Sequence, residues 1–170
     1  MVLLIPLICI TAGCGPRDNV LKKIANEGKI NNDAAMVNEA IIEISASDQY
    51  IWDLLVNIPD WRKWNPDITE VLANGISYKG DNFVWRWGSK INTAVHLFEP
   101  HAKLSWFSKN MAYRSIIVWE IKKISDQKTQ VTLKESRDGF FMHFRSSTKH
   151  RQKLESWLEN LKNRAEVVHF

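Results

Sequence analysis

Apolar residues recur along the chain with two different periods, and the changes of period outline the elements of the fold. Residues 36–45, MVNEAIIEIS, are rich in isoleucine, which is typical of a strand. Ser47 then offers a helix cap, and apolar residues recur at helical spacing from Tyr50 to Leu55. This pattern predicts a helix of about three turns that ends at Pro59.

After Pro66 the period changes to two, which is typical of strands with one buried face. Phe83, Trp85 and Trp87 share one face of a predicted strand, and Arg86 lies on the other. The predicted strands lie at residues 68–73, 83–87, 91–98, 104–106, 114–122 and 131–136. Consecutive strands joined by short turns favour an antiparallel sheet.

The last segment returns to a helical period. Its apolar residues form one face of a long amphipathic helix: Leu154, Trp157, Leu158, Leu161, Ala165 and Val168. A sheet with one apolar face needs a cover, and this helix is the only predicted element large enough to supply it. The sequence therefore predicts an α+β fold, with an antiparallel sheet of about six to seven strands and short helices after the first strand.

The N-terminus reads as a targeting segment. Residues 1–10, MVLLIPLICI, are apolar and uncharged but shorter than the roughly 20 residues that span a bilayer. They have the length of the apolar region of a signal peptide. Small residues precede Cys14 in ITAGCG, which resembles a bacterial lipobox and implies that a lipid is attached to Cys14. Unlike most signal peptides, this segment has no Lys or Arg before Arg17, and a buried N-terminal strand is the alternative.

The expected organisation therefore has three parts. Residues 1–13 are a lipoprotein-type signal peptide, residues 14–35 are a polar tether with a short helical pattern from Val20 to Ala25, and residues 36–170 are a single domain. The expected location is the bacterial cell envelope, with the chain anchored to a membrane through Cys14.

Composition excludes several classes of function. The net charge of +4 is spread among alternating acids and bases, without the basic stripe of a nucleic-acid-binding protein. Both cysteines lie in the first fourteen residues, and the histidines show no metal-ligand spacing, so we expect no metal and no cofactor. The chain also lacks a G-x-S-x-G nucleophile motif and a glycine-rich phosphate loop.

The order and spacing of several stretches resemble the START-like or SRPBCC superfamily, and within it the polyketide cyclase/dehydrase-like branch. These stretches include IEISASDQYIWDLLVNIPDWRKWNPDI, GDNFVWRW, PHAKLSWFS, IIVWEI, TQVTLKES and WLENLKNRAE, and together they span residues 39–166. The resemblance implies a helix-grip fold, in which a curved antiparallel sheet wraps around the C-terminal helix and leaves an apolar cavity between them. In the stretch DWRKWNPD, we interpret Trp64 as a plug at one end of the grip, with Trp61 half exposed beside it.

The candidate ligand cavity consists of the side chains expected to face the C-terminal helix or the cavity mouth: Phe83, Trp85, Trp87, Trp106, Tyr113, Ile117, Trp119, Leu133 and Glu135. Packing alone is the alternative explanation for the aromatic residues. Strand alternation places Glu135 on the inward face, where a carboxylate needs an ion pair, hydrogen bonds or a proton. An ion pair or a hydrogen bond to an indole is one interpretation of Glu135, and a catalytic acid is the other.

These observations leave three hypotheses. The first is a lipid-anchored envelope protein that binds a small hydrophobic, aromatic or lipid ligand without chemistry. The second is a polyketide cyclase- or hydrolase-like enzyme that uses Glu135, with His96 or Tyr113 as a helper. The third is an interaction module whose cavity is well below the roughly 300 Å³ of ordinary ligand pockets.

Overall fold

The computed structural model describes residues 18–167, apart from the side chain of Phe140. The strands are β1 (Met36–Ile44), β2 (Ile68–Leu72), β3 (Asn82–Trp87), β4 (Ser89–Glu99), β5 (Lys103–Lys109), β6 (Arg114–Ser125) and β7 (Lys128–Asp138). The helices are α1 (Asp18–Asn26), α2 (Asp48–Val56), η1 (Ile58–Asp60), α3 (Trp61–Trp64), η2 (Phe140–Phe144) and α4 (Ser147–Val167), where η marks a 3-10 helix.

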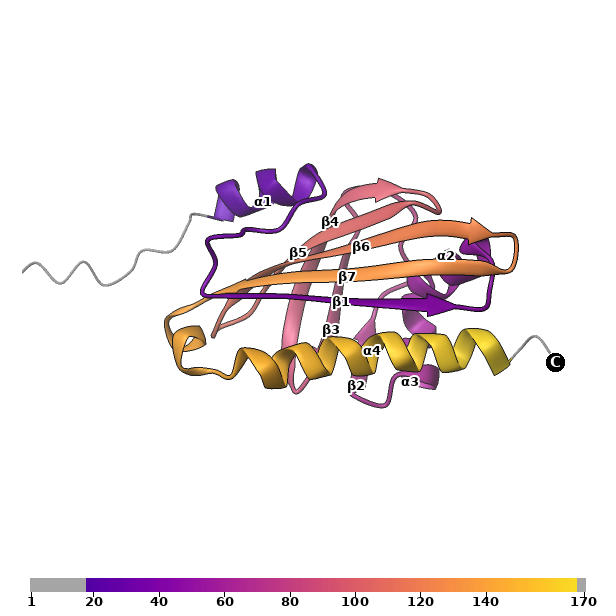
Figure 1. Ribbon diagram of the computed structural model, residues 1–170. Helices are drawn as coiled ribbons and strands as arrows, with labels where there is room; N and C mark the ends of the chain where they lie inside the picture. The colour runs from indigo at the N-terminus through magenta and orange to yellow at the C-terminus, as the bar shows by residue number, and fades with distance from the viewer. Residues whose placement is uncertain (1–17, 168–170) are drawn as a thin grey trace, which may run out of the picture.

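The seven strands form one antiparallel sheet in the order β1-β7-β6-β5-β4-β3-β2. From β2 to β7 each strand pairs with the next in the chain, while β1 pairs with β7 at the far edge, so that Met36 faces Arg137. The curved sheet and its long helix are seen in Figure 1. The predicted α+β fold with an antiparallel sheet is confirmed.

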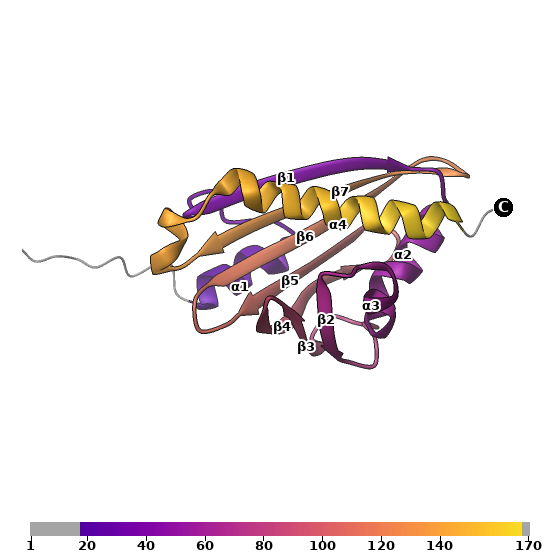
Figure 2. The same cartoon turned by 90° about the horizontal axis from the view of Figure 1, so that it is seen from below.

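Helix α4 crosses one face of the sheet along nearly its whole length (Figures 1 and 2). It begins at Ser147, before the apolar pattern that predicted it. Its buried residues are His150, Leu154, Trp157, Leu158, Leu161 and Ala165. His150 therefore continues the apolar face by one helical turn toward the N-terminus, because residues four apart lie on the same side of a helix.

The short helices after β1 close one end of the interior. The hydroxyl of Ser47 accepts the backbone N–H of Tyr50 at 3.2 Å and so caps α2 as predicted. Pro59 has no N–H to donate to the carbonyl of Leu55, four residues earlier. The indole N–H of Trp61 donates to that carbonyl instead, at 3.0 Å. The chain therefore turns inward at Trp61.

Trp61 corrects one prediction. We expected it to be half exposed beside a buried Trp64, but Trp61 is fully buried and Trp64 retains 8% exposure. The hydrogen bond to Leu55 anchors Trp61 against α2 and aims its ring into the interior. Both residues lie on the buried side of the helical turn, and Trp61 is the deeper one.

Helix α1 packs on the opposite face of the sheet from α4 (Figure 1). Its Leu21 and Ala25 are buried against Phe107, Ile116 and Val118, which are the outward-facing apolar residues of β5 and β6. The described part of the predicted tether, residues 18–35, is therefore folded onto the domain. The sequence pattern did contain the helix from Val20 to Ala25, but not the surface that receives it.

The segment after α1 is also tied to the sheet. The backbone N–H of Asn31 donates to the hydroxyl of Ser136, and that of Ala35 donates to the carboxylate of Asp138. The predicted signal peptide and Cys14 lie outside the described residues. No helix within residues 18–167 has both the length and the hydropathy needed to cross a bilayer.

Candidate ligand-binding site at one end of the helix grip

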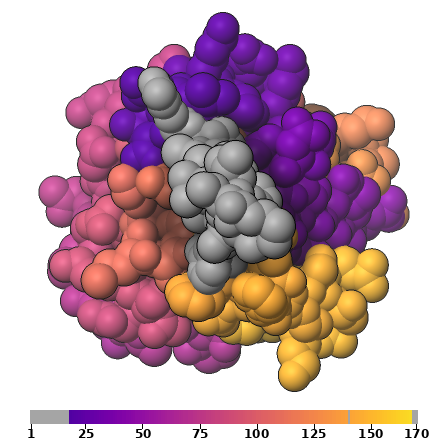
Figure 3. All heavy atoms as spheres, turned by 90° about the vertical axis from the view of Figure 1, so that its left-hand side faces the viewer, coloured from indigo at the N-terminus to yellow at the C-terminus, as the bar shows by residue number. Residues whose placement is uncertain are grey.

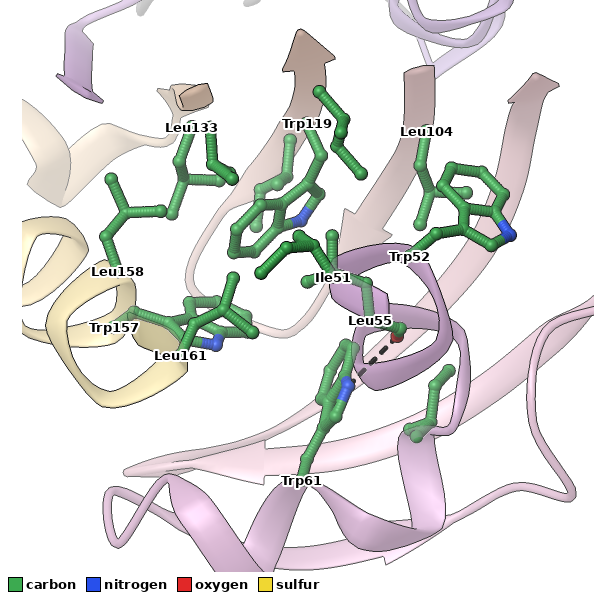
Figure 4. Packing of buried hydrophobic residues seen from close by; sticks show 14 of the residues in the cluster. Ile51, Trp52, Leu55, Trp61, Leu104, Trp119, Leu133, Trp157, Leu158 and Leu161 are labelled. Atoms are coloured by element: carbon green, nitrogen blue, oxygen red, sulfur yellow. Dashed lines mark hydrogen bonds between the residues drawn. The ribbon is translucent and has the colours of Figure 1, made fainter. Parts of the chain in front are cut away.

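A cluster of tryptophans fills the space between the sheet and α4. The five tryptophans that are at most 1% exposed are Trp61, Trp85, Trp106, Trp119 and Trp157. Trp157 reaches in from α4, with ring centroids 5.3 to 5.5 Å from those of Trp61, Trp85 and Trp119. Figure 4 shows Trp61, Trp119 and Trp157 converging from α3, β6 and α4. The contacts of Trp157 with Trp61 and Trp119 are edge contacts, which are favourable beyond the burial of apolar area.

The polar atoms of this cluster are only partly satisfied. The indole N–H of Trp85 donates to the hydroxyl of Thr93 at 2.9 Å, and that of Trp61 donates to Leu55. Among the described residues, the buried N–H groups of Trp87, Trp106, Trp119 and Trp157 have no acceptor. Because an unpaired buried donor costs about 1–3 kcal/mol, an acceptor introduced near these indoles would be bound favourably.

The residues predicted to line a cavity largely lie in this cluster. Phe83, Trp85, Trp106, Ile117, Trp119 and Leu133 are buried in the core between the sheet and α4, and Trp87 packs at its edge. Tyr113, in the loop directly before β6, and Glu135, on β7, lie near the same edge, and both contact Arg137. The predicted set is therefore brought together, with most of its side chains packed against one another.

Glu135 is the centre of a buried charged group at this edge. Its Oε1 accepts the Nε–H of Arg137 at 2.6 Å, and its Oε2 lies 2.6 Å from Nε2 of His150 on α4. Burial alone would raise the pKa of Glu135, but the charge of Arg137 and the hydrogen bond from His150 outweigh burial and hold it below its ordinary value. Both oxygens of the carboxylate are occupied, so Glu135 anchors Arg137 and His150, which agrees with the ion-pair interpretation of this residue.

Two aromatic rings contact the guanidinium of Arg137. Its central carbon lies 4.4 Å from the ring centre of Tyr113 and 5.7 Å from that of Trp87. Burial alone would lower the pKa of Arg137. The adjacent carboxylate of Glu135 raises it by more than burial lowers it, so the guanidinium stays charged. Burial also raises the pKa of Tyr113 above its usual value, against the opposing charge of Arg137. This edge of the cluster therefore carries a fixed cation among aromatic rings.

A cavity of about 210 Å³ opens beside this charged group. It is formed by the start of β1, the end of β7, η2 and the first turns of α4, and its lining is Met36, Arg137, Met142, Arg145, Ser146, Lys149, His150 and Lys153. Trp87 lies directly behind it, since Arg137, His150 and Lys153 all contact the Trp87 ring. Figure 3 faces this end of the molecule, where the orange and yellow residues of η2 and α4 reach the surface.

Two further hollows, of about 560 and 370 Å³, lie away from the core. The larger is lined by mixed charges from the α1 side of the sheet, including Glu27, Lys103 and Glu120. The other lies around the loop between β5 and β6, from Lys109 to Arg114. No tryptophan lines either of these two hollows. The cavity of about 210 Å³, whose lining residues contact Trp87, is therefore the better candidate site.

Of the two proposed helpers of Glu135, only Tyr113 is near it. His96 lies on the outer side of the sheet, where Nδ1 is 3.1 Å from the side-chain oxygen of Asn26 in α1. Burial lowers the pKa of His96, and the charges of Lys22 and Lys79 lower it further. The sheet separates His96 from Glu135, so these two do not form a catalytic pair.

Sequence reasoning missed the lining residues that come from β1, η2 and α4. The burial of His150 could have been predicted, because it lies four residues before Leu154 on the buried face of α4. The inward direction of Arg137 could also have been predicted, since residues two apart on a strand point to the same side and Glu135 was predicted to point inward. No pattern in the sequence indicated that Met36, at the start of the first strand, would meet them.

Solved structures of similar architecture place this fold among known proteins. A hypothetical protein from Helicobacter pylori matches with a TM-score of 0.67 and 18% sequence identity, over 76% of this chain and 86% of that one. A START superfamily protein from Mycobacterium smegmatis matches with a TM-score of 0.65 and 13% identity, over 78% of this chain and 98% of that one. The chain has a START-like fold.

The START-like fold also matches the di-domain ARO/CYC StfQ from the steffimycin biosynthetic pathway, with a TM-score of 0.63 and 14% identity. That match covers 75% of this chain and 44% of StfQ. No family model and no curated protein matches the sequence. The predicted helix-grip architecture is thereby confirmed at the level of the fold.

Proposed function

We propose that this START-like domain binds a small apolar or aromatic molecule at the end of the helix grip beside Trp87. The cavity of about 210 Å³ that abuts the tryptophan cluster is the observation that carries this proposal. Met36 and Met142 supply apolar surface in its lining, and both are buried. Methionine is flexible and polarizable, so it adapts to ligands of irregular shape.

The size of the cavity restricts the ligand. Ordinary ligand pockets have volumes of roughly 300–1,000 Å³, and this one is smaller. The proposal is therefore for a small molecule, or for part of a longer one whose remainder lies outside. The START superfamily protein and the ARO/CYC protein with the same fold support a binding role over a purely structural one.

A pair of substitutions at Ser146 tests the site. Ser146 is exposed and lines the cavity, so Ser146→Phe fills the opening, while Ser146→Ala removes the hydroxyl without filling it. Titration of the purified protein with decan-1-ol and with naphthalene, followed by tryptophan fluorescence and native mass spectrometry, reports binding. We expect saturable quenching in the wild type and in Ser146→Ala, and a loss of at least about tenfold in affinity in Ser146→Phe, which corresponds to about 1.4 kcal/mol.

Absence of saturable binding to either probe would refute the proposal and favour the interaction module. Equal affinities for the Ala and Phe variants would place any binding elsewhere on the protein. Ser146→Ala controls for the hydroxyl, which accepts the backbone N–H of Lys149 at 3.3 Å near the start of α4. Both variants lose that hydrogen bond, so it does not affect their comparison.

The cellular location of this binding domain remains a prediction from the sequence: a bacterial envelope protein anchored through a lipid on Cys14. The apolar N-terminal residues and the lipobox-like ITAGCG motif support it. Asp18, four residues later, forms ion pairs with Lys109 and Arg114. Arg114 is paired across β6 and β7 with Asp138, the neighbour of the cavity residue Arg137. If a lipid on Cys14 anchors the chain, the membrane would therefore lie near the cavity.

Metabolic labelling with a fatty acid tests the anchor. Label should be incorporated by the wild type and by Cys9→Ser, because Cys9 lies within the predicted signal peptide, and should be lost in Cys14→Ser. Label retained in Cys14→Ser, or absent from the wild type, would contradict the lipoprotein prediction.

A further inference from the structure

The charges around the cavity are almost all of one sign. Arg137, Arg145, Lys149 and Lys153 line it, together with His150, and no carboxylate is among the lining residues. Within the described chain, no carboxylate forms an ion pair with Arg145, Lys149 or Lys153. Like charges gathered around one hollow repel each other, and an anion bound among them would relieve that repulsion.

Glu135 does not supply that anion to the cavity. It is buried beneath the lining, and its two oxygens are taken by Arg137 and His150. Arg137 makes this bond through Nε alone, and its two terminal nitrogens form no hydrogen bond with the described residues. The side chain of Arg137 retains 14% exposure, and it borders the cavity. Glu135 therefore fixes the position of a guanidinium whose outer donors remain available.

Helix α4 adds to the positive potential. Its N-terminus borders the cavity, since Ser146 and Lys149 belong to the lining and the helix starts at Ser147. The first turn contains no acidic residue, although acidic side chains are the ones usually stabilised at this end of a helix. Basic residues occupy the first two turns instead, which reverses the usual preference. The helix end and the lining side chains thus favour the same sign of ligand charge.

We propose that the ligand of this cavity is an anionic amphiphile, with a carboxylate, sulfate or phosphate group held by Arg137, Arg145, Lys149 and Lys153. Its apolar body contacts Met36 and Met142. Arginine suits this role because its planar group can bind two oxygens at once, and lysine adds point charges on flexible stems. The inference deepens the proposed function, on which it rests, by assigning a charge to the ligand.

The test compares ligands that differ only in the head group. Decanoate, decyl phosphate and decan-1-ol, each below its micellar concentration, are titrated against the purified protein by calorimetry, with inorganic phosphate as the anion without a tail. We expect the wild type to bind decanoate and decyl phosphate at least about tenfold more tightly than decan-1-ol. Raising the salt concentration should reduce that preference, because part of the site is exposed to solvent.

A triple variant and a charge-matched control identify the site. Arg145→Ala/Lys149→Ala/Lys153→Ala should bring the affinities for the acid and the alcohol to within about twofold of each other. These three side chains are exposed, so the fold should be retained. The control is Arg62→Ala/Lys79→Ala/Lys122→Ala, which removes the same charge from exposed positions outside the cavity and should keep the preference.

Each outcome separates this inference from the proposed function. If the wild type binds decan-1-ol as tightly as decanoate, the anionic ligand is refuted and the apolar binding site stands. If none of the three amphiphiles binds, the anionic amphiphile is refuted, and the proposed function then stands only if naphthalene binds. If inorganic phosphate binds as tightly as decyl phosphate, or if the control variant loses the preference as fully as the cavity variant, the anionic amphiphile is refuted at this site.

Discussion

The hydrogen bond between Trp61 and Leu55 leads to the sharpest test of the core. Trp61→Phe and Trp106→Phe remove the same atoms from two fully buried positions in one cluster. Lost contacts and the resulting cavity should cost each variant about 1–2 kcal/mol of unfolding free energy. The two positions differ in one respect, since the indole N–H of Trp61 has an acceptor and that of Trp106 has none among the described residues.

This difference sets the magnitude. Trp61→Phe leaves the Leu55 carbonyl buried and unpaired, because Pro59 cannot supply an N–H, and adds about 1–3 kcal/mol. Trp106→Phe removes a donor that is already unpaired, which offsets its packing loss by an amount of the same order. We expect Trp61→Phe to be the more destabilising by at least about 2 kcal/mol, or about 4–8 °C in Tm for a chain of this size.

Urea denaturation followed by far-ultraviolet circular dichroism measures the difference without relying on the fluorescence of the altered residues. Equal slopes with denaturant would show that both variants unfold from equally compact native states. If Trp106→Phe proves as destabilising as Trp61→Phe, the Trp106 N–H has an acceptor in solution, and the description of the cluster as carrying unsatisfied donors is wrong.

Three further substitutions test other parts of the structure. Glu135→Gln leaves Arg137 buried without its counter-charge and should cost about 3–5 kcal/mol at pH 7. Because folding lowers the pKa of Glu135, the stabilisation that its carboxylate supplies is present above pH ~4.3 and is lost on further acidification. The unfolding free energy of the variant should therefore depend less on pH below that value than the unfolding free energy of the wild type. Parallel pH profiles of the two proteins would contradict the pairing of Glu135 with Arg137 and His150. Leu21→Ala should destabilise by about 2–3 kcal/mol and speed hydrogen exchange in α1, whereas Val20→Ala, at an exposed position, should change little; equal effects would refute the docking of α1. Gly139→Ala should lower Tm, because a Cβ there would lie 2.4 Å from the carbonyl oxygen of Ala112; an unchanged Tm would show that the two loops separate easily.

Strand alternation and helical spacing were enough to predict an α+β fold with an antiparallel sheet, because each buried face follows directly from its period. The helix grip itself was implied by the resemblance to the START-like superfamily. The predicted apolar positions of α4 from Leu154 to Ala165 are buried as the spacing indicated, and Val168 lies outside the described residues. The same reasoning placed Glu135 inward on β7, where it is 1% exposed. Periodicity depends on local backbone geometry, so it identifies which face of an element is buried even when the partner element is unknown.

The partners themselves depend on contacts that no local pattern encodes. Ile116 and Val118 interrupt the expected alternation in β6, and this continuous apolar run signals a strand buried on both faces. We interpreted only one face of β6, and therefore predicted that residues 14–35 form a tether. The cavity posed the same difficulty, since Met36 and Lys149 are far apart in sequence and meet only when β1 joins β7.

The pairing of the first strand with the last also affects when the chain can fold during synthesis. Met36 must wait for Arg137 before it has a partner, and at 5–20 residues per second a ribosome takes about 5–20 s to make the residues between them. Until then β1 has no neighbour, and the face of the sheet that α4 covers stays open. Contacts of such high sequence separation also slow folding after release. If the N-terminal segment directs export, as proposed from the sequence, that delay would keep the chain unfolded while this segment engages the export machinery.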